Sequence, residues 1–297
     1  MVSLGCMCDT IAKSGSVIAE KLGLPFFMID APRGLRMTPE GEPVVAPEYI
    51  EYYADEYREL TSFLERLTGH SLDEKKLAEI CRRANQALDL WEEISRLRQA
   101  SPCPMGALDE AVSLFVPMAL LGTEEAIDFL TAVKQEVKER VDRGQGVIED
   151  ERHRVLILGG PAWWYDLGLF NVFEELGTVP VKHELDVGWA AGRFDPDDPA
   201  RSWADRLIRN YGTIDLLKAR LAHIRQLVDD YRADGLVILS HWGCRVLSGH
   251  NLAVKETIYK ELGLPTLILD GDLCDDRHRA SRQQDLDRIE QFVEILE

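Results

Sequence analysis

Apolar residues along the chain fall either into short continuous runs or into stretches with helical spacing. The run Leu236–Leu239 predicts a short, fully buried strand, and Thr266–Leu269 predicts a second one. Between them, an amphipathic pattern opens after Ser248 and predicts a helix over Leu252–Leu262. This strand–helix–strand order places Cys244 just past the carboxyl end of the first strand, where open α/β sheets bind their ligands.

The N-terminus repeats this pattern. Val2–Gly5 predicts a strand, Thr10–Leu22 a helix and Phe26–Ile29 a second strand. The helix-to-strand junctions "KLGLPFFMID" and "ELGLPTLILD" match closely, and a cysteine turn follows the first strand of each unit. We therefore expect two similar half-domains that face each other. Because the chain begins on a strand at residue 2, we also expect relatives to possess an upstream segment.

Helical spacing dominates the range 47–143, which follows a Pro- and Gly-rich loop at 33–46. Ser71 with Glu74 has the spacing of a capping box. Thr123 precedes two glutamates, as an N-cap residue does. After a first helix, we expect helices at 72–99, 107–120 and 123–143.

A further α/β pattern starts at Arg154 with "RVLILGGP", a buried strand that runs into Gly-Gly-Pro. Such a strand end can lead into a phosphate-binding helix N-terminus, but neither GxGxxG nor a Walker motif is present. We expect irregular structure over 185–213. The remaining predicted elements are helices at 164–176, 215–233 and 280–296 and a strand at 179–183.

These elements predict an α/β fold of two units with short parallel sheets and a helical insertion between them. A chain of 297 residues is long enough for two domains. We expect a partial N-terminal α/β unit at 1–46, a helical region at 47–150 and a C-terminal Rossmann-like α/β domain at 151–297.

Charge and composition narrow the class of protein. The net charge of −18 argues against binding to nucleic acid, whose phosphates would be repelled. No apolar run approaches the ~20 residues of a membrane helix, and the N-terminus lacks the pattern of a signal peptide. We therefore expect a cytoplasmic enzyme, in which the 6 cysteines serve as thiols or metal ligands rather than as disulfides.

Cys8 and Cys244 are the candidate metal ligands and cofactor-binding residues. Each ends the first strand of one of the two similar units, so both thiols would point into one cleft if the units face each other. Soft thiolates there could hold an iron–sulfur cluster or zinc, and two separate buried cysteines are the alternative. Cys6 could be a further ligand. Neighbouring residues at a strand end point in different directions, so we expect one of Cys6 and Cys8 to be structural.

Other residues that could carry chemistry have less specific patterns. Cys81 lies in the middle of a predicted helix and is expected in the core, whereas Cys103 in a turn and Cys274 after the last strand are either ligands or ordinary thiols. His241 could be a ligand or proton donor near Cys244, or simply hydrogen-bonded within its turn. Four aromatic residues either pack in the core or form a cleft wall: Trp163, Trp164, Tyr165 and Trp189. A basic run either starts a solvated helix or contacts a phosphorylated substrate or a partner: Arg277, His278, Arg279 and Arg282.

Three segments resemble one known family. "HWGCRVLSGHNLAVKETIYKELGLPTLILDGDLCDDRHRASRQQDLDRIEQFVEIL" is similar to the C-terminus of the 2-hydroxyacyl-CoA dehydratase D-component family, which is related to benzoyl-CoA reductase subunits and double-cubane-cluster proteins. "CMCDTIAKSG" resembles the middle Cys-Asp motif of the family, which places its cysteine on Cys8. "RVLILGGP" resembles the start of the second α/β domain. The resemblance covers essentially the whole chain, and the C-terminal motif is its most specific part.

The resemblance implies an iron–sulfur cluster, either 4Fe-4S or a double cubane, bound by Cys8 and Cys244 between two Rossmann-like domains. It also implies a related second subunit and a separate ATP-hydrolysing activator that supplies one electron at very low potential. In such dehydratases the acyl-CoA becomes a ketyl radical anion and the 2-hydroxyl group leaves. The family usually carries a further cysteine ligand upstream. Cys6, another thiol or a partner chain would have to replace that ligand, or the cluster is lost.

We therefore expect an iron–sulfur subunit of a 2-hydroxyacyl-CoA dehydratase-like or benzoyl-CoA-reductase-like system in anaerobic metabolism. One alternative is a double-cubane-type reductase that acts on small molecules without CoA. Another is a cluster-free assembly or binding subunit. Iron and sulfide content separates the last alternative from the other two, and competition by acyl-CoA separates the first hypothesis from the double-cubane reductase.

Overall fold

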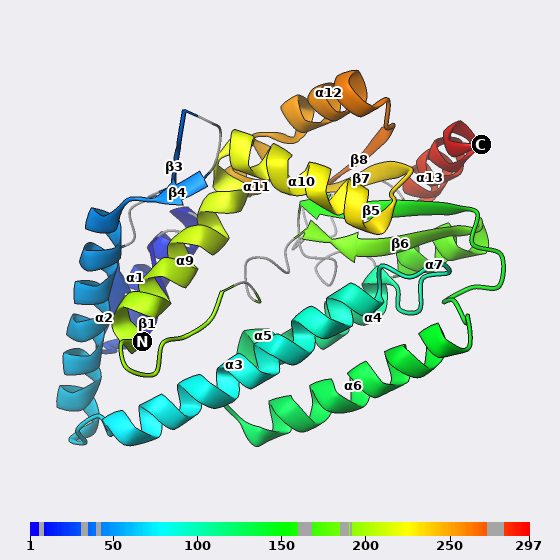
Figure 1. The fold of residues 1–297 in the computed structure, drawn as a ribbon. Helices are drawn as coiled ribbons and strands as arrows, with labels where there is room; N and C mark the ends of the chain where they lie inside the picture. Colours follow the sequence, from blue (N-terminus) through cyan, green and yellow to red (C-terminus); the bar gives the residue numbers. More distant parts are fainter. Residues whose placement is uncertain are drawn as a thin grey trace.

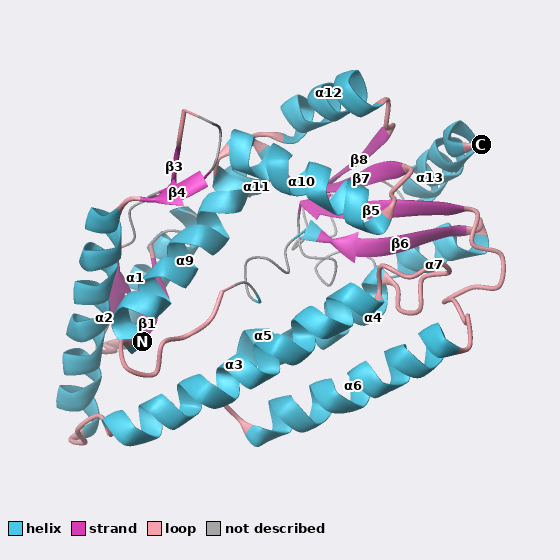
Figure 2. Cartoon of the chain, in the orientation of Figure 1, coloured by secondary structure: helices cyan, strands magenta, loops and turns pink. Residues whose placement is uncertain are grey.

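The chain forms parallel sheets connected and covered by helices, which confirms the α/β class (Figures 1 and 2). Within the described residues, a two-stranded and a four-stranded sheet are parallel, and a further two-stranded sheet is antiparallel. The computed structural model describes residues 1–5, 9–30, 35–39, 43–159, 168–184, 190, 192–271 and 282–297.

The N-terminal strand–helix–strand unit forms as predicted. Strand β1 (Val2–Leu4) pairs in parallel with β2 (Phe27–Ile29), and helix α1 (Asp9–Leu22) lies between them in sequence. Few side chains of α1 are buried, and several apolar ones on this unit are exposed. The exposed set is Met1, Val2, Val17, Ile18, Leu22, Leu24 and Met28.

The Pro- and Gly-rich segment that follows is more ordered than the sequence predicted. Within the expected loop, β3 (Leu35–Met37) and β4 (Pro43–Val45) pair antiparallel. Helix α2 (Pro47–Thr68) then starts with proline at its first position, where the missing N–H costs nothing, and ends at Gly69 in the left-handed region. Three-residue strands carry too little pattern to be distinguished from a loop by sequence alone.

The prediction of irregular structure over 185–213 is wrong for its second half. Helix α9 (Pro199–Asp215) occupies it, with the Asp198 side chain accepting a hydrogen bond from the N–H of Arg201 at 3.2 Å. Ala204 and Ile208 of α9 pack on Tyr53 of α2, so these two helices, far apart in sequence, lie side by side (Figure 1). The sequence did carry the signal, because an Asp-Pro pair is typical of an N-cap and first helical position.

The predicted helical region is present, with its boundaries shifted. The proposed Ser71–Glu74 capping box is wrong, because Asp73 is the N-cap and accepts hydrogen bonds from two backbone N–H groups. Thr123 is confirmed as an N-cap and accepts from Ala126 N at 3.2 Å. The helices of this region are α3 (Glu74–Leu97), α4 (Ala107–Ser113), α5 (Phe115–Ala119) and α6 (Glu124–Asp142).

The second sheet is parallel, with strand order β6-β5-β7-β8, and is buried on both faces. Helices α10 and α12 cover one face, and α7 and α13 cover the other, together with α4 (Figure 1). The strands are β5 (His153–Gly159), β6 (Thr178–His183), β7 (Gly235–His241) and β8 (Thr266–Gly271). The helices are α7 (Gly168–Glu175), α10 (Leu217–Tyr231), α12 (Asn251–Leu262) and α13 (Arg282–Leu296).

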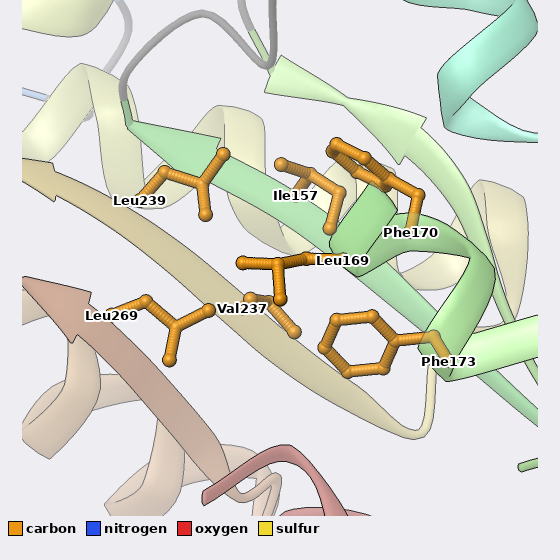
Figure 3. Close-up of a pocket in the computed structure, with 7 residues that line it drawn as sticks. All are labelled: Ile157, Leu169, Phe170, Phe173, Val237, Leu239 and Leu269. Atoms are coloured by element: carbon orange, nitrogen blue, oxygen red, sulfur yellow. The ribbon is translucent and has the colours of Figure 1, made fainter. Parts of the chain in front are cut away.

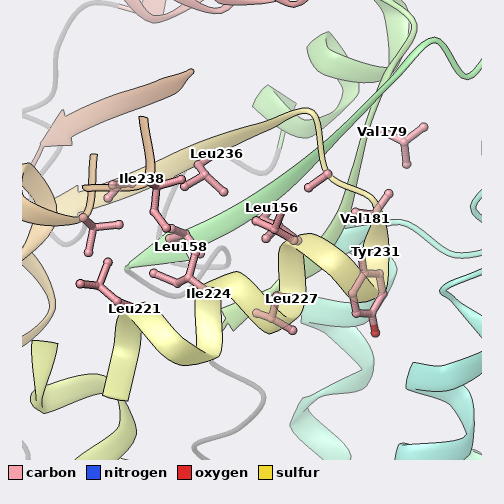
Figure 4. Close-up of a cluster of buried hydrophobic side chains, with 14 of the residues drawn as sticks. Leu156, Leu158, Val179, Val181, Leu221, Ile224, Leu227, Tyr231, Leu236 and Ile238 are labelled. Carbon is pink, nitrogen blue, oxygen red and sulfur yellow. The ribbon is translucent and has the colours of Figure 1, made fainter. Parts of the chain in front are cut away.

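Successive residues of each strand point to opposite helical layers. Leu156 and Leu236 face Ile224 of α10 (Figure 4), while Ile157 and Val237 face the α7 side. This explains why the strands read as continuous apolar runs. Burial on both faces stabilises the sheet by about 25 cal/mol for each Å² of apolar surface removed from water, so it forms a rigid base for whatever lies at its carboxyl edge.

A buried charge network joins the helical region to this sheet. The Glu110 carboxylate of α4 lies 2.5 Å from Arg98 Nη1 and 2.6 Å from Lys182 Nζ of β6, and all three side chains are buried. Arg98 Nη2 also donates to the Val181 carbonyl oxygen at 2.6 Å, and His183 N donates to Glu110 Oε2 at 2.8 Å. The network therefore fixes α4 against the strand β6.

The two similar junctions of the sequence have the same local structure. Gly23 ends α1 with φ +63°, and Gly263 ends α12 with φ +72°. Both glycines adopt the left-handed conformation that only glycine reaches readily, and each is followed by Leu-Pro and a strand that pairs in parallel with the first strand of its unit. The internal similarity therefore extends from the sequence to the backbone.

Candidate functional site

Cys244 lies at the carboxyl edge of the four-stranded sheet, as predicted from the sequence. Strand β7, between β5 and β8, ends at His241, and Cys244 follows as the N-cap of the short helix α11 (Arg245–Ser248). This short helix was not predicted. Cys244 N donates to the His241 carbonyl oxygen at 3.1 Å, and Ser248 Oγ donates to the same oxygen at 2.7 Å. The cysteine turn is thus tied to the end of its strand.

Trp242 and Gly243, the two residues between His241 and Cys244, are exposed to solvent. Trp242 is 61% exposed, and its backbone N–H donates at 3.1 Å to the carbonyl oxygen of Gly271, the last residue of β8. A Cβ at Gly243 would lie 2.8 Å from His241 Nε2, so the imidazole occupies the space above this glycine. Any larger residue at position 243 would displace the imidazole, and His241 therefore lies against the segment that leads into Cys244.

A fully buried ion pair lies beside this turn, between Glu184 after β6 and Arg220 of α10. Burial alone would raise the pKa of the Glu184 carboxyl, but the neighbouring Arg220 guanidinium outweighs burial and holds that pKa below its ordinary value. Sequence reasoning missed both residues. The available signal was a glutamate directly after an apolar strand and an arginine on the apolar face of a helix, two places where an unpaired charge is costly.

The described thiols differ in how well they fit a soft metal or an iron–sulfur cluster. Cys244 is a free cysteine, partly exposed at the end of a strand, and this placement fits a ligand. Cys81 is buried in α3 as predicted, and burial raises the pKa of its thiol. Cys103 is buried too, which also raises the pKa of its thiol, and its Sγ lies 3.2 Å from the Met105 carbonyl oxygen. Cys81 and Cys103 therefore fit the core rather than a metal site.

Most other residues of the predicted site lie outside the described residues. Among the side chains that the structure does describe, no group of three or more His, Cys, Asp or Glu is placed to hold a metal ion. The described side chains therefore do not complete a metal site around Cys244, and the predicted meeting of Cys8 and Cys244 in one cleft stays a prediction. Outside the described residues lie Cys6, Cys8, Trp163, Trp164, Tyr165, Trp189, Cys274, Arg277, His278 and Arg279, whereas Arg282 begins α13.

Two hollows in the described structure do not include Cys244. One, of about 10 Å³, lies among apolar side chains of α7 and the sheet such as Leu169, Phe173 and Leu239, and it is a packing gap (Figure 3). A water molecule needs roughly that volume and also polar partners, which the apolar lining of this cavity does not supply. The other, of about 450 Å³, lies between α3 and α10 and has a mixed lining that includes Trp91 and Lys182. Neither hollow adds a thiol to the candidate site.

An open parallel sheet with a free thiol at its carboxyl edge has the arrangement of an α/β protein that binds a ligand there. The family model for 2-hydroxyglutaryl-CoA dehydratase, D-component, matches residues 1–296, and the chain belongs to this family. The resemblance read from the three sequence segments is thereby confirmed.

Curated relatives are similar to the chain over nearly its whole length. Lactoyl-CoA dehydratase subunit alpha of Anaerotignum propionicum is 25% identical over 100% of this chain and 69% of its own length. A benzoyl-CoA reductase subunit of Thauera aromatica is 24% identical over 98% of this chain and 68% of its own length. (R)-2-hydroxyglutaryl-CoA dehydratase, subunit alpha, of Acidaminococcus fermentans is 23% identical over 98% of this chain. The chain spans 59% of that last relative.

These relatives are named as subunits, so the similar proteins belong to multi-subunit systems. None of the helices in the described part of the chain combines the length and the apolarity needed to cross a lipid bilayer. The predicted cytoplasmic location is not tested by these observations and stays a prediction.

Proposed function

We propose that this chain is an iron–sulfur subunit of a 2-hydroxyacyl-CoA dehydratase-like or benzoyl-CoA-reductase-like system. The observation that carries the proposal is Cys244, a partly exposed free thiol at the carboxyl end of a central parallel strand, in a chain of this family. Thiolates at such a position bind soft metals, whereas the other two described thiols are buried.

In this proposal, Cys8 and Cys244 hold a 4Fe-4S cluster or a double cubane, with Cys6 as a candidate further ligand. The two parallel units, each ending its helix at Leu-Gly-Leu-Pro, are treated as two Rossmann-like units that face each other. Such a cluster would supply one-electron chemistry at low potential. The contribution of this chain is to hold the Cys244 thiol at the sheet edge through the hydrogen bonds of His241 and Ser248.

The proposed partners are an acyl-CoA substrate, a related second subunit and an ATP-dependent activator that donates the electron. The names of the relatives support the first two, since they are subunits of CoA-dependent dehydratases and of a reductase. The net charge of −18 is consistent with the expectation that nucleic acid is not a partner. Exposed apolar residues on α1 and β2, such as Leu22 and Met28, offer a surface that a related subunit could cover.

The test is the iron and sulfide content of the full chain, purified without oxygen and, where needed, co-expressed with the related subunit. Cys244→Ser and Cys8→Ser are expected to abolish the cluster and leave the fold intact, because serine is a harder and more basic donor than cysteine. Cys81→Ser is the matched control. It should keep the iron and lose stability instead, since it places a hydroxyl in the core.

Wild-type iron in both Cys8→Ser and Cys244→Ser would contradict the assignment of the ligands. An iron-free wild-type chain, even with its partner present, would favour the cluster-free assembly or binding subunit. If iron is present, an added acyl-CoA should bind the complex and inhibit turnover of the substrate under assay by competing for the same site. Turnover of a small molecule that acyl-CoA does not inhibit would instead favour the double-cubane-type reductase.

A further inference from the structure

The Glu184–Arg220 pair is connected to more than its two members. Arg220 Nη2 lies 2.6 Å from Glu184 Oε1, and Arg220 Nε donates to Glu184 Oε2 at 3.1 Å, so the contact is bidentate. Gly159 N, at the end of β5, donates to Glu184 Oε1 at 2.5 Å. Arg220 Nη1 donates to the carbonyl oxygen of Leu247 in α11 at 3.0 Å. One ion pair therefore joins the ends of two strands, helix α10 and the helix that Cys244 caps.

Stability alone does not account for such a pair. Both side chains bear the full cost of desolvation, since neither retains any solvent-accessible surface. Replacing a buried ion pair by apolar residues of similar volume is often neutral or stabilising. What apolar residues cannot do is donate a hydrogen bond to the Leu247 carbonyl oxygen. The pair therefore supplies a fixed geometry at the edge of the sheet.

The geometry that it fixes is that of the cysteine turn. The bonds of Cys244 and Ser248 to the His241 carbonyl oxygen are local and hold the turn to its own strand. The bond from Arg220 to Leu247, three residues past Cys244, reaches across from α10, 27 residues away in sequence. The planar guanidinium makes this bond and the bidentate contact at once, which the single ammonium of lysine cannot reproduce.

We propose that Glu184 and Arg220 are positioning residues that hold the Cys244 turn in its ligand-ready conformation before any metal arrives. This inference rests on the proposed function, because it assigns the pair to the thiol that is proposed as the ligand. It concerns the residues of the chain itself, so it is tested on the full chain without a cluster as well as with one.

The sharpest variant is the double substitution Glu184→Leu with Arg220→Met, which removes both buried charges and the bond to Leu247. We expect this variant to stay folded with wild-type protection in β7 and in β5 up to Leu158. It should lose protection in the turn and at Gly159 N, which no longer has its acceptor. The single variant Arg220→Lys should loosen the turn as well. The matched control is Arg154→Lys, because Arg154 is also buried and ties the opposite end of α10 through its bond to the Tyr231 carbonyl oxygen at 2.6 Å.

The first measurements use the cluster-free chain: amide hydrogen exchange over residues 242–250 and the rate of Cys244 alkylation, followed peptide by peptide. We expect both rates to rise about tenfold or more in the double variant and in Arg220→Lys, and to stay at wild-type values in Arg154→Lys. Equal effects in Arg220→Lys and Arg154→Lys would show that the pair is merely structural. An unchanged turn in the folded double variant would overturn the proposal.

A second measurement follows the reconstituted chain. The electron paramagnetic resonance spectrum of a bound cluster should broaden or shift in Arg220→Lys and keep its wild-type form in Arg154→Lys, because only the first substitution releases a ligand turn. Alkylation and exchange do not require iron. An iron-free wild-type chain would therefore contradict the proposed function but would leave the exchange and alkylation results for the turn unchanged. A failure of the iron–sulfur function and a failure of the positioning role of Glu184 and Arg220 are thus distinguishable.

Discussion

Asn85 and Phe194 exchange two hydrogen bonds although 109 residues separate them in the chain. Asn85 Nδ2 donates to the Phe194 carbonyl oxygen at 2.7 Å, and Phe194 N donates to Asn85 Oδ1 at 2.7 Å. The carboxamide on α3 thus pairs with the backbone as another peptide group would. The Arg206 guanidinium of α9 lies 4.4 Å from the centre of the Phe194 ring. Together these contacts anchor the segment that leads into α9.

We predict that Asn85→Asp destabilises the protein by about 1–3 kcal/mol, because it removes the donor and turns a carboxylate oxygen toward the Phe194 carbonyl oxygen. Urea unfolding at neutral pH measures the change. Asn171→Asp is the control, since Asn171 is exposed on α7 and should change stability by no more than about 0.5 kcal/mol. Equal losses in both variants would contradict a specific role for the Asn85 pair.

The Glu110 network predicts sensitivity to acid. Burial alone would raise the pKa of the Glu110 carboxyl, but Arg98 and Lys182 outweigh burial and lower that pKa from 4.5 to about 2. Because the folded-state pKa lies below the ordinary value, the charged carboxylate stabilises the fold. This contribution is complete above about pH 4.5 and is lost as the pH falls toward 2.

Glu110→Gln should therefore cost roughly 3–5 kcal/mol at pH 7, because it leaves Arg98 and Lys182 buried without their partner. The difference between wild type and variant should shrink as the pH falls below about 4.5. Urea unfolding between pH 7 and pH 3 measures this difference. Glu136→Gln, which removes an exposed partner of Arg140 on α6, should cost no more than about 1 kcal/mol. A difference for Glu110→Gln that does not vary with pH would contradict the argument.

Gly159 occupies a position that only glycine fits. Its φ is +89°, and an added Cβ would lie 2.4 Å from the Leu239 carbonyl oxygen of the neighbouring strand. We predict that Gly159→Ala lowers the thermal midpoint sharply, because it combines backbone strain of about 1–3 kcal/mol with a clash against main chain. Gly69→Ala is the control. Its φ is +72° with no atom within 4 Å, so it should show the conformational cost alone.

The exposed apolar surface of the N-terminal unit yields a prediction that rests on the proposed partner. Leu22 is 66% exposed on α1, with Ile18 one turn earlier, and we expect a related subunit to cover them. Leu22→Glu should weaken the co-expressed complex in light scattering after size exclusion. Ile295→Glu, at a site 68% exposed on α13, should leave the complex intact. A wild-type chain that stays monomeric in the presence of the related subunit would contradict the prediction.

The parts of the fold that the sequence predicted share a strong local pattern. The strands β5, β7 and β8 are continuous apolar runs, and the cap at Thr123 follows from side-chain chemistry alone. Helix α9 was missed because glycines and prolines before it masked the Asp198–Pro199 start signal. The pair β3–β4 was missed because strands of three residues depend on tertiary contacts rather than on pattern.

The candidate site also contains features that could be predicted from the sequence and features that could not. The position of Cys244 at the carboxyl edge was predictable, because topology fixes where a parallel strand ends. The link from Arg220 to the cysteine turn was not, because it joins residues from separate elements and depends on their three-dimensional packing. A single sequence marks both charges as unusual without naming their partners. The arrangement of Cys8 relative to Cys244 depends on packing in the same way, and it stays a prediction.

The contacts of Arg98 and Glu110 with β6 have a consequence for self-association. β6 is the outermost described strand on its side of the sheet, and unpaired N–H and C=O groups on such a strand are a template for a foreign strand. Here the Val181 carbonyl oxygen is engaged by Arg98 and the His183 N–H by Glu110. The helical region thus occupies these two backbone groups of β6 with charged side chains, so a neighbouring polypeptide cannot use them to add a further strand at this part of the sheet border.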